Sequence, residues 1–149
     1  MKQALADALE KRGYQNLTPV QTAGTAPELV DADLLVSAQT GSGKTVGFGL
    51  AIGDSLLGED EIFERASKPL ALVIAPTREL ALQVKRELQW LYGEARATMA
   101  SCVGGMDMRD ERRTLERGAH IVVATPGRLR DHIMRKSIDL SELLSLIHI

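Results

Sequence analysis

The sequence predicts an α/β fold in which a parallel sheet is flanked by helices. Short apolar runs rich in β-branched residues alternate with longer stretches of helical period, which is typical of repeated β-α units. The chain has 149 residues, 44% of them apolar and only five of them prolines, so it can bury one core. We therefore expect residues 1–149 to form a single domain without a repeat.

The strands and helices follow from these runs. An amphipathic helix is expected between two of the strands, because Leu80, Val84, Leu88 and Leu91 share one helical face. Residues 45–57 are apolar almost all round and predict a buried helix, whereas the charged residues 58–68 predict an exposed connection. The expected strands are residues 34–37, 70–75, 97–103 and 119–124, with a fifth beginning near Ser145.

Residues 38–45 have the pattern of a phosphate-binding loop. They follow the first expected strand and read Ala38, Gln39, Thr40, Gly41, Ser42, Gly43, Lys44 and Thr45. The two glycines allow consecutive backbone N–H groups to point at phosphate oxygens, Lys44 adds charge, and Thr45 offers a hydroxyl to Mg²⁺ at a helix N-terminus. A simple Gly/Ser-rich turn is the structural alternative, but the order of strand, loop and helix favours nucleotide binding.

Three other segments have recognisable patterns. They are Thr-Pro-Val-Gln at 18–21, Pro-Thr-Arg-Glu-Leu at 76–80 and Thr-Pro-Gly-Arg at 125–128, with a glycine pair at 104–105 between the last two. Together with the loop, their order and spacing resemble the DEAD-box RNA helicases over nearly the whole chain. The resemblance implies a RecA-like first helicase domain, with a Q-motif region at 1–33. Within 34–149 it implies motif I at 38–45, motif Ia at 76–80, motif Gly-Gly at 104–105 and motif Ib at 125–128.

The resemblance assigns roles for which the sequence also offers plainer explanations. Gln21 would recognise the adenine of ATP, although Thr18 and Gln21 also have the spacing of a helix capping box. Thr77 and Thr125 have the pattern of helix N-caps, which is compatible with RNA binding because helix N-termini present free N–H groups to phosphates. The residues expected at the RNA sugar-phosphate backbone are Pro76, Thr77, Arg78, Gly104, Gly105, Thr125, Pro126, Gly127 and Arg128.

The acidic Asp-Glu-Ala-Asp motif of the family does not occur in this sequence. We expect the domain to be incomplete at its C-terminus and catalytically incompetent alone, although its parent would be an ATP-dependent RNA helicase using Mg²⁺ and a second RecA-like domain. Two alternatives remain open. The chain could be a stand-alone nucleotide- or RNA-binding module, or another phosphate-loop NTPase.

Composition narrows the remaining possibilities. The formal charge of −2 lacks the excess of basic residues that binds nucleic acid by charge alone, so an RNA site must be local. We expect a cytoplasmic protein without a membrane segment, and Cys102 as a core thiol. His120, His132 and His148 have no metal-ligand spacing, and residues 109–117 predict a solvated helix face.

Overall fold

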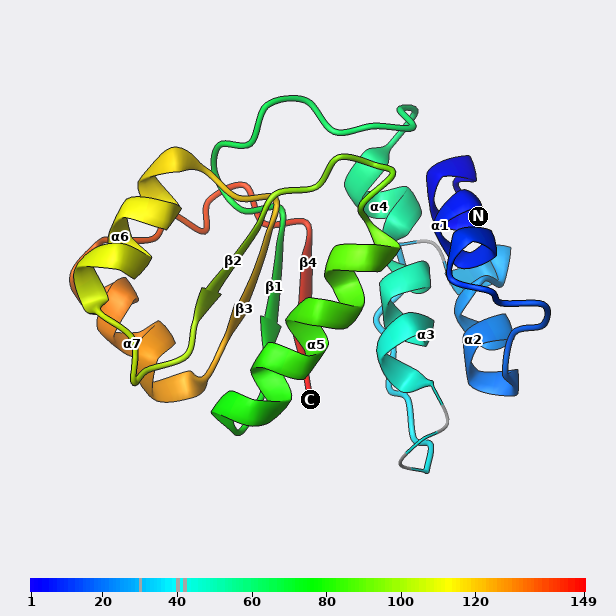
Figure 1. Cartoon of the computed structure of the whole chain (residues 1–149), viewed down its shortest axis with the longest axis horizontal. Coiled ribbons are helices and arrows are strands. Elements are labelled where there is room, and N and C mark those ends of the chain that lie inside the picture. The colour runs from blue at the N-terminus through cyan, green and yellow to red at the C-terminus, as the bar shows by residue number, and fades with distance from the viewer. Residues whose placement is uncertain (30, 40, 42) are drawn as a thin grey trace.

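The computed structural model of the chain describes residues 1–149 except Val30, Thr40 and Ser42. Its helices and strands alternate through most of the sequence (Figure 1). The helices are α1 (Gln3–Lys11), α2 (Pro19–Gly24), the short 3-10 helix η1 (Pro27–Leu29), α3 (Lys44–Ala51), α4 (Gly53–Leu57), α5 (Arg78–Leu91), α6 (Met108–Arg117) and α7 (Pro126–Met134). The strands are β1 (Ala71–Ile74), β2 (Met99–Cys102), β3 (Ile121–Ala124) and β4 (Ser145–His148).

The four strands form one parallel sheet in the order β2-β3-β1-β4. Val73 of β1 lies between Val123 of β3 and Ile147 of β4 in the register. The sheet confirms the strands predicted at 70–75, 97–103, 119–124 and from Ser145 onward. Because every pair is parallel, the carboxyl ends of the strands lie at one edge, where ligands of open α/β sheets commonly bind.

Helices cover both faces of the sheet, as the prediction of a flanked parallel sheet requires (Figure 1). One core joins Val73 and Val123 to α3 and α5, and a second core joins Leu72 and Val122 to Leu129 of α7. Neighbouring residues of a strand point to opposite faces, so β1 and β3 contribute to both cores. These strands are therefore buried on both sides, which explains their continuous apolar sequences.

Helix α5 confirms the predicted amphipathic helix. Val84, Leu88 and Leu91 are fully buried, and Leu80 packs against the same core while remaining partly exposed. The helix begins after Thr77, whose hydroxyl accepts a hydrogen bond from the Leu80 N–H at 3.2 Å. Such a cap satisfies one of the N–H groups that lack a partner in the first turn.

The apolar run 45–57 forms two helices, α3 and α4, that meet at Ile52. Glycines let α3 approach its neighbours closely. A Cβ at Gly24 of α2 would overlap the carbonyl oxygen of Gly47, and a Cβ at Gly49 would lie 2.7 Å from a Leu91 methyl group. Close packing thus explains why poor helix formers occupy a buried helix.

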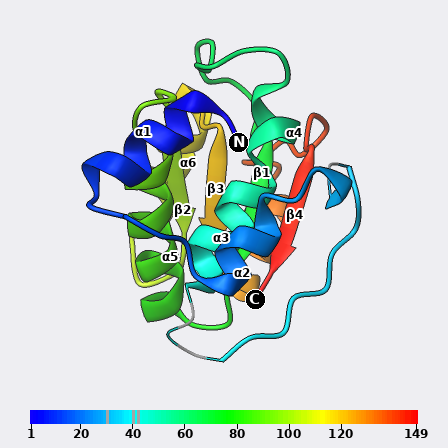
Figure 2. The same ribbon diagram turned by 90° about the vertical axis from the view of Figure 1, so that its right-hand side faces the viewer.

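The prediction of a strand at 34–37 is wrong. These residues belong to no strand, and Leu35 is fully exposed. Figure 2 shows the surrounding segment running outside β4, away from the sheet. A strand needs a neighbour's backbone for its hydrogen bonds, and no described strand supplies one to this segment.

Candidate functional site

The predicted motifs gather at the carboxyl edge of the sheet. Residues 76–78 follow β1, the glycine pair 104–105 follows β2, and residues 125–128 follow β3. These strands are neighbours in the order β2-β3-β1, so segments far apart in sequence converge on one edge. The phosphate-binding loop opens the separate helix α3, which packs beside α5 and α2 (Figure 2).

The two glycines of the loop have a left-handed backbone conformation. Gly41 and Gly43 have φ angles of 81° and 84°, and Gly43 is the N-cap of α3. The ammonium of Lys44 donates to the Ala38 carbonyl oxygen at 2.7 Å, while Thr45 is partly buried in the first turn. Free N–H groups, an ammonium and a hydroxyl are a donor set suited to phosphate and Mg²⁺.

Gln39 is exposed beside these residues. The predicted loop residues Thr40 and Ser42 lie outside the described part of the chain.

The Gln21 side chain makes hydrogen bonds both to the N-cap residue of α2 and to this loop. Its Oε1 accepts from the Thr18 N–H at 3.0 Å, and the Thr18 hydroxyl accepts from the Gln21 N–H at 3.4 Å, so the capping box is present. Its Nε2 donates to the Gly43 carbonyl oxygen at 3.4 Å, and the side chain is only 1% exposed. The capping interpretation is confirmed, whereas the recognition of adenine stays a prediction.

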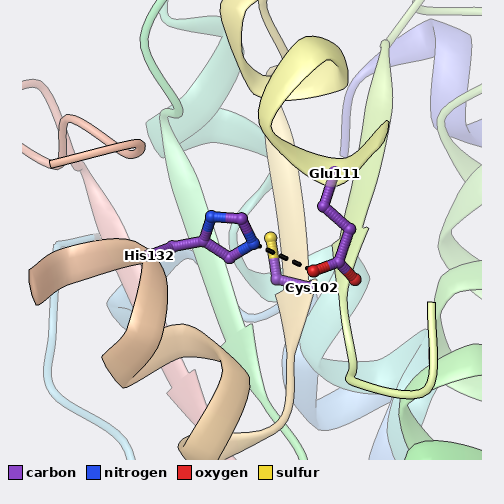
Figure 3. Close-up of side chains that lie close together, drawn as sticks. All are labelled: Cys102, Glu111 and His132. Atoms are coloured by element: carbon purple, nitrogen blue, oxygen red, sulfur yellow. Dashed lines mark hydrogen bonds and ion pairs between the residues drawn. The ribbon is translucent and has the colours of Figure 1, made fainter. Parts of the chain in front are cut away.

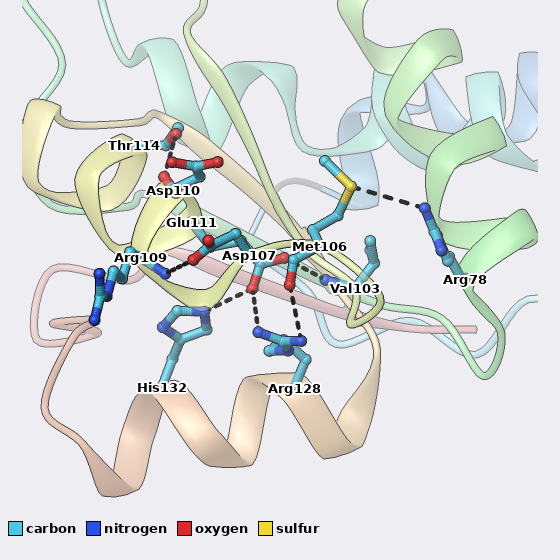
Figure 4. Close-up of polar contacts among 10 residues, drawn as sticks. All are labelled: Arg78, Val103, Met106, Asp107, Arg109, Asp110, Glu111, Thr114, Arg128 and His132. Carbon is cyan, nitrogen blue, oxygen red and sulfur yellow. Dashed lines mark hydrogen bonds and ion pairs between the residues drawn. The ribbon is translucent and has the colours of Figure 1, made fainter.

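The glycine pair forms a turn that lies between two arginines. Gly104 and Gly105 have φ angles of 73° and 66°, and a Cβ at Gly105 would overlap the guanidinium of Arg78. Arg128 donates from Nη2 to the Met106 carbonyl oxygen at 3.2 Å, and Arg78 contacts the Met106 sulfur at 3.7 Å (Figure 4). The structure therefore brings motifs Ia, Gly-Gly and Ib together around one turn.

The N-terminus of α7 differs in one detail from the predicted N-cap at Thr125. Thr125 occupies the N-cap of α7 and Pro126 its first turn, but the Thr125 side chain makes no capping hydrogen bond. A Cβ at Gly127 would have no other atom within 4 Å, and Pro76 is exposed after β1. This first turn follows β3 at the same sheet edge as the two arginines, and a helix N-terminus at such a position can bind phosphate.

One buried carboxylate in this region was not predicted from the sequence. Glu111 is only 5% exposed, although it belongs to the run 109–117 that we predicted to be a solvated face. That prediction is wrong at Glu111, because α6 turns this one side chain toward β2 and α7. A charged residue flanked by other charged residues carries no periodic apolar signal, so nothing local in the sequence distinguishes it.

Glu111 is also one of three buried side chains that meet between α6 and α7 (Figure 3). Ligand atoms of Cys102, Glu111 and His132 lie within 4.8 Å of one another. Burial raises the pKa of the Cys102 thiol to about 12, which disfavours the thiolate that metals bind. Arg128 also lies 3.4 Å from Glu111 Oε1 and repels a cation, so this cluster is best explained as a polar contact within the core.

His120 is a buried histidine with both ring nitrogens engaged. Nδ1 accepts from the Thr98 N–H at 2.8 Å, Nε2 lies 2.8 Å from the Glu64 carbonyl oxygen, and the ring stacks on Phe63. Burial lowers the pKa of His120, against a smaller opposite effect of the Glu64 hydrogen bond. The prediction of a structural role for His120 agrees with these contacts.

No helix in the described part of the chain combines the length and hydrophobicity of a membrane span.

The sequence is similar to those of known helicases. The family described as DEAD/DEAH box helicase matches residues 18–148. The chain is 36% identical to the DEAD-box ATP-dependent RNA helicase CshA of Bacillus licheniformis and 43% identical to the ATP-dependent rRNA helicase RRP3 of Meyerozyma guilliermondii. Each comparison covers 96% of this chain, but only 28% and 29%, respectively, of the relative.

A solved structure supports the same assignment. The chain resembles a hypothetical ATP-dependent RNA helicase from Sulfolobus tokodaii with a TM-score of 0.84 and 32% identity, over 99% of this chain and 41% of that one. The match confirms the predicted RecA-like α/β fold and shows that the chain corresponds to one part of such a protein. The chain belongs to the DEAD/DEAH box helicase family.

Proposed function

We propose that this chain is the ATP- and RNA-binding part of an ATP-dependent RNA helicase. It spans less than a third of the curated relatives described above, so the activity of a whole helicase is an inference from them. The observation that carries the proposal is the convergence of motifs Ia, Gly-Gly and Ib on one sheet edge, in a chain whose residues 38–45 have the sequence pattern of a phosphate-binding loop.

In this proposal, residues 38–45 hold the triphosphate of ATP. The N–H groups at the start of α3 bind phosphate oxygens, and Lys44 exchanges its hydrogen bond with Ala38 for one with a phosphate. Thr45 would ligate Mg²⁺, which supplies charge neutralisation when it is bound. Gln21 would select adenine through its amide, because guanine reverses the positions of donor and acceptor.

RNA would lie along the carboxyl edge, with its phosphates at Thr77, Thr125 and the neighbouring N–H groups. Arg78 and Arg128 add the local charge that the net charge of the chain lacks. Contacts with phosphate and sugar do not depend on base identity, so we propose binding without sequence preference.

We further propose that residues 1–149 form a partial RecA-like domain of a cytoplasmic protein, and that hydrolysis needs groups outside this sequence. These groups are the Asp-Glu-Ala-Asp carboxylates and a second RecA-like domain, which the family uses for Mg²⁺ and for charge at the transition state. The chain alone should bind ATP but turn it over slowly. Robust RNA-stimulated hydrolysis by the 149 residues would contradict this part of the proposal.

Nucleotide titrations test the ATP site directly. Fluorescent ATP and GTP, each with Mg²⁺, are titrated against the wild type, Lys44→Ala and Lys68→Ala. Loss of a charge-assisted hydrogen bond predicts about 10- to 100-fold weaker ATP binding for Lys44→Ala. Lys68 precedes β1 and forms an ion pair with Asp139, so it lies at the opposite end of the strand from the motifs. The Lys68→Ala variant should therefore bind ATP normally.

Equal affinity of the wild type for ATP and GTP would exclude adenine selection by Gln21. An unchanged ATP affinity in Lys44→Ala would exclude the loop as the phosphate site.

A further inference from the structure

The buried carboxylate of Glu111 joins three elements behind the proposed RNA-binding edge (Figure 4). Oε2 accepts from the Val103 N–H at 3.0 Å, immediately before the glycine pair. Oε1 lies 2.9 Å from His132 Nε2 and 3.4 Å from Arg128 Nη1 of α7. Helix α6 thus contacts both the end of β2 and the arginine of motif Ib through one side chain.

The same contacts fix the turn at both ends. Glu111 holds Val103 on one side of Gly104 and Gly105, and Arg128 holds the Met106 carbonyl oxygen on the other. Glycines with positive φ lose more conformational freedom on ordering than other residues, so such a turn needs contacts of this kind to keep one conformation.

Arg128 keeps binding capacity while it is held. A guanidinium has five N–H donors, and the contacts with Met106 and Glu111 involve its Nη2 and Nη1 nitrogens. Further donors can therefore reach an anion. Its side chain is 16% exposed, which leaves access from solvent but little freedom to leave this orientation.

We propose that Glu111 is a positioning residue for RNA binding: it orients Arg128 and the Gly104-Gly105 turn toward the RNA backbone without touching RNA itself. This inference rests on the proposed function, because it explains how the motif Ib arginine acts at the same edge. A buried carboxylate with both oxygens engaged can hold Arg128 and the turn in place. If either oxygen lost its partners, the buried negative charge of Glu111 would be poorly compensated.

The test compares Glu111→Gln with Glu116→Gln. Both substitutions remove one negative charge from α6, but Glu116 is exposed and pairs with Arg112 of its own helix at 3.8 Å. Electrostatics alone predicts that each change strengthens RNA binding or leaves it unchanged. Positioning predicts the opposite for Glu111→Gln: about tenfold weaker binding of labelled oligouridylate, with ATP affinity unchanged, because Arg128 loses a charged partner.

The salt dependence separates positioning from contact. Arg128→Ala should lower the slope of log K against log salt by about 0.7, because one phosphate contact with single-stranded RNA is lost. Glu111→Gln should keep the wild-type slope, since Arg128 retains its charge. In the Arg128→Ala background, Glu111→Gln should cause little further loss of RNA affinity.

Glutamine can still accept from the Val103 N–H, and circular dichroism checks that each variant is folded. If Glu111→Gln does not fold, Arg128→Lys tests the same contact, because lysine keeps the charge but cannot present two nitrogens to Met106 and Glu111. Arg128→Lys should then bind RNA more weakly with the wild-type salt slope. RNA affinity equal to wild type in either folded variant would overturn the inference alone, whereas a wild type without RNA binding would overturn the proposed function and this inference together.

Discussion

The side-chain amide of Gln21 donates from Nε2 to the Gly43 carbonyl oxygen at 3.4 Å, which connects the capped helix α2 to the N-cap residue of α3. A Cβ at Gly43 would overlap this amide, so glycine at 43 serves the contact as well as its positive φ angle. The glutamine that caps one helix therefore also contacts the loop proposed to bind phosphate.

The two roles of Gln21 can be separated by substituting its capping partner. Thr18→Ala removes the hydroxyl that accepts from the Gln21 N–H and should lower the free energy of unfolding by about 1 kcal/mol. It leaves the Gln21 amide intact, so the preference for ATP over GTP should persist. Gln21→Ala should lose both stability and that preference. Urea unfolding and fluorescent nucleotide titration measure the two effects, and a Thr18→Ala variant without nucleotide preference would show that Gln21 acts through the cap alone.

The two glycines of the turn should respond differently to alanine. Both have positive φ angles, so Gly104→Ala and Gly105→Ala should each cost about 1–2 kcal/mol of stability. Only a Cβ at Gly105 overlaps the guanidinium of Arg78, whereas the nearest atom to one at Gly104 is Arg128 Nε at 3.9 Å. We expect Gly105→Ala to weaken oligouridylate binding more than Gly104→Ala does. Equal RNA affinities of the two variants would mean that the position of Arg78 does not matter for binding.

The effect of alanine at a helical glycine on stability should depend on the space around that glycine. Alanine at Gly49 gains helix propensity but places its Cβ 2.7 Å from Leu91 Cδ2 and 3.0 Å from Leu88 Cδ2. Overpacking of this kind costs about 1–3 kcal/mol, so Gly49→Ala should lower the midpoint of thermal unfolding. A Cβ at Gly127 would have no other atom within 4 Å, so Gly127→Ala should gain about 0.4–1 kcal/mol. The opposite ranking of the two midpoints would contradict the packing of α3 against α5.

His120 should make stability depend on pH. Because burial lowers its pKa in the folded chain, the unfolded chain binds the proton more readily. The contribution of His120 to the free energy of unfolding is complete above the ordinary pKa of about 6.5 and is lost as the pH falls towards the lowered value. Urea unfolding at several pH values should show a weaker dependence in His120→Gln than in the wild type.

His148→Gln is the matched control for that experiment, because His148 is exposed at the end of β4. A pH dependence that changes in His148→Gln but not in His120→Gln would rule out the buried ring as its source.

Much of the fold and the arrangement of the motifs could be predicted from local patterns. The apolar runs located β1 to β4, the period of Leu80, Val84 and Leu88 located α5, and Thr77 marked its start. Burial follows such periods because each helix or strand must place one face against the core. The resemblance to DEAD-box helicases is confirmed by the family match and by the relatives.

The rest depended on neighbours that the sequence does not reveal. Residues 34–37 have the composition of a strand but no described strand beside them, and Glu111 has a polar environment in sequence but a buried one in space. Strand pairing and burial each need two surfaces in contact. A local sequence pattern describes only one of these two surfaces.

The sequence by itself thus determined most of the helices and strands, their order, and a loop at 38–45 that has the pattern of a phosphate-binding loop. Only the tertiary structure decided that Gln21 contacts Gly43, that Arg78 and Arg128 flank one turn, and that Glu111 lies behind it. The physical reason is that most of these contacts join distant parts of the chain: Gln21 and Gly43 are 22 positions apart, as are Met106 and Arg128. Such contacts form only when the parallel sheet and its helices bring the segments together.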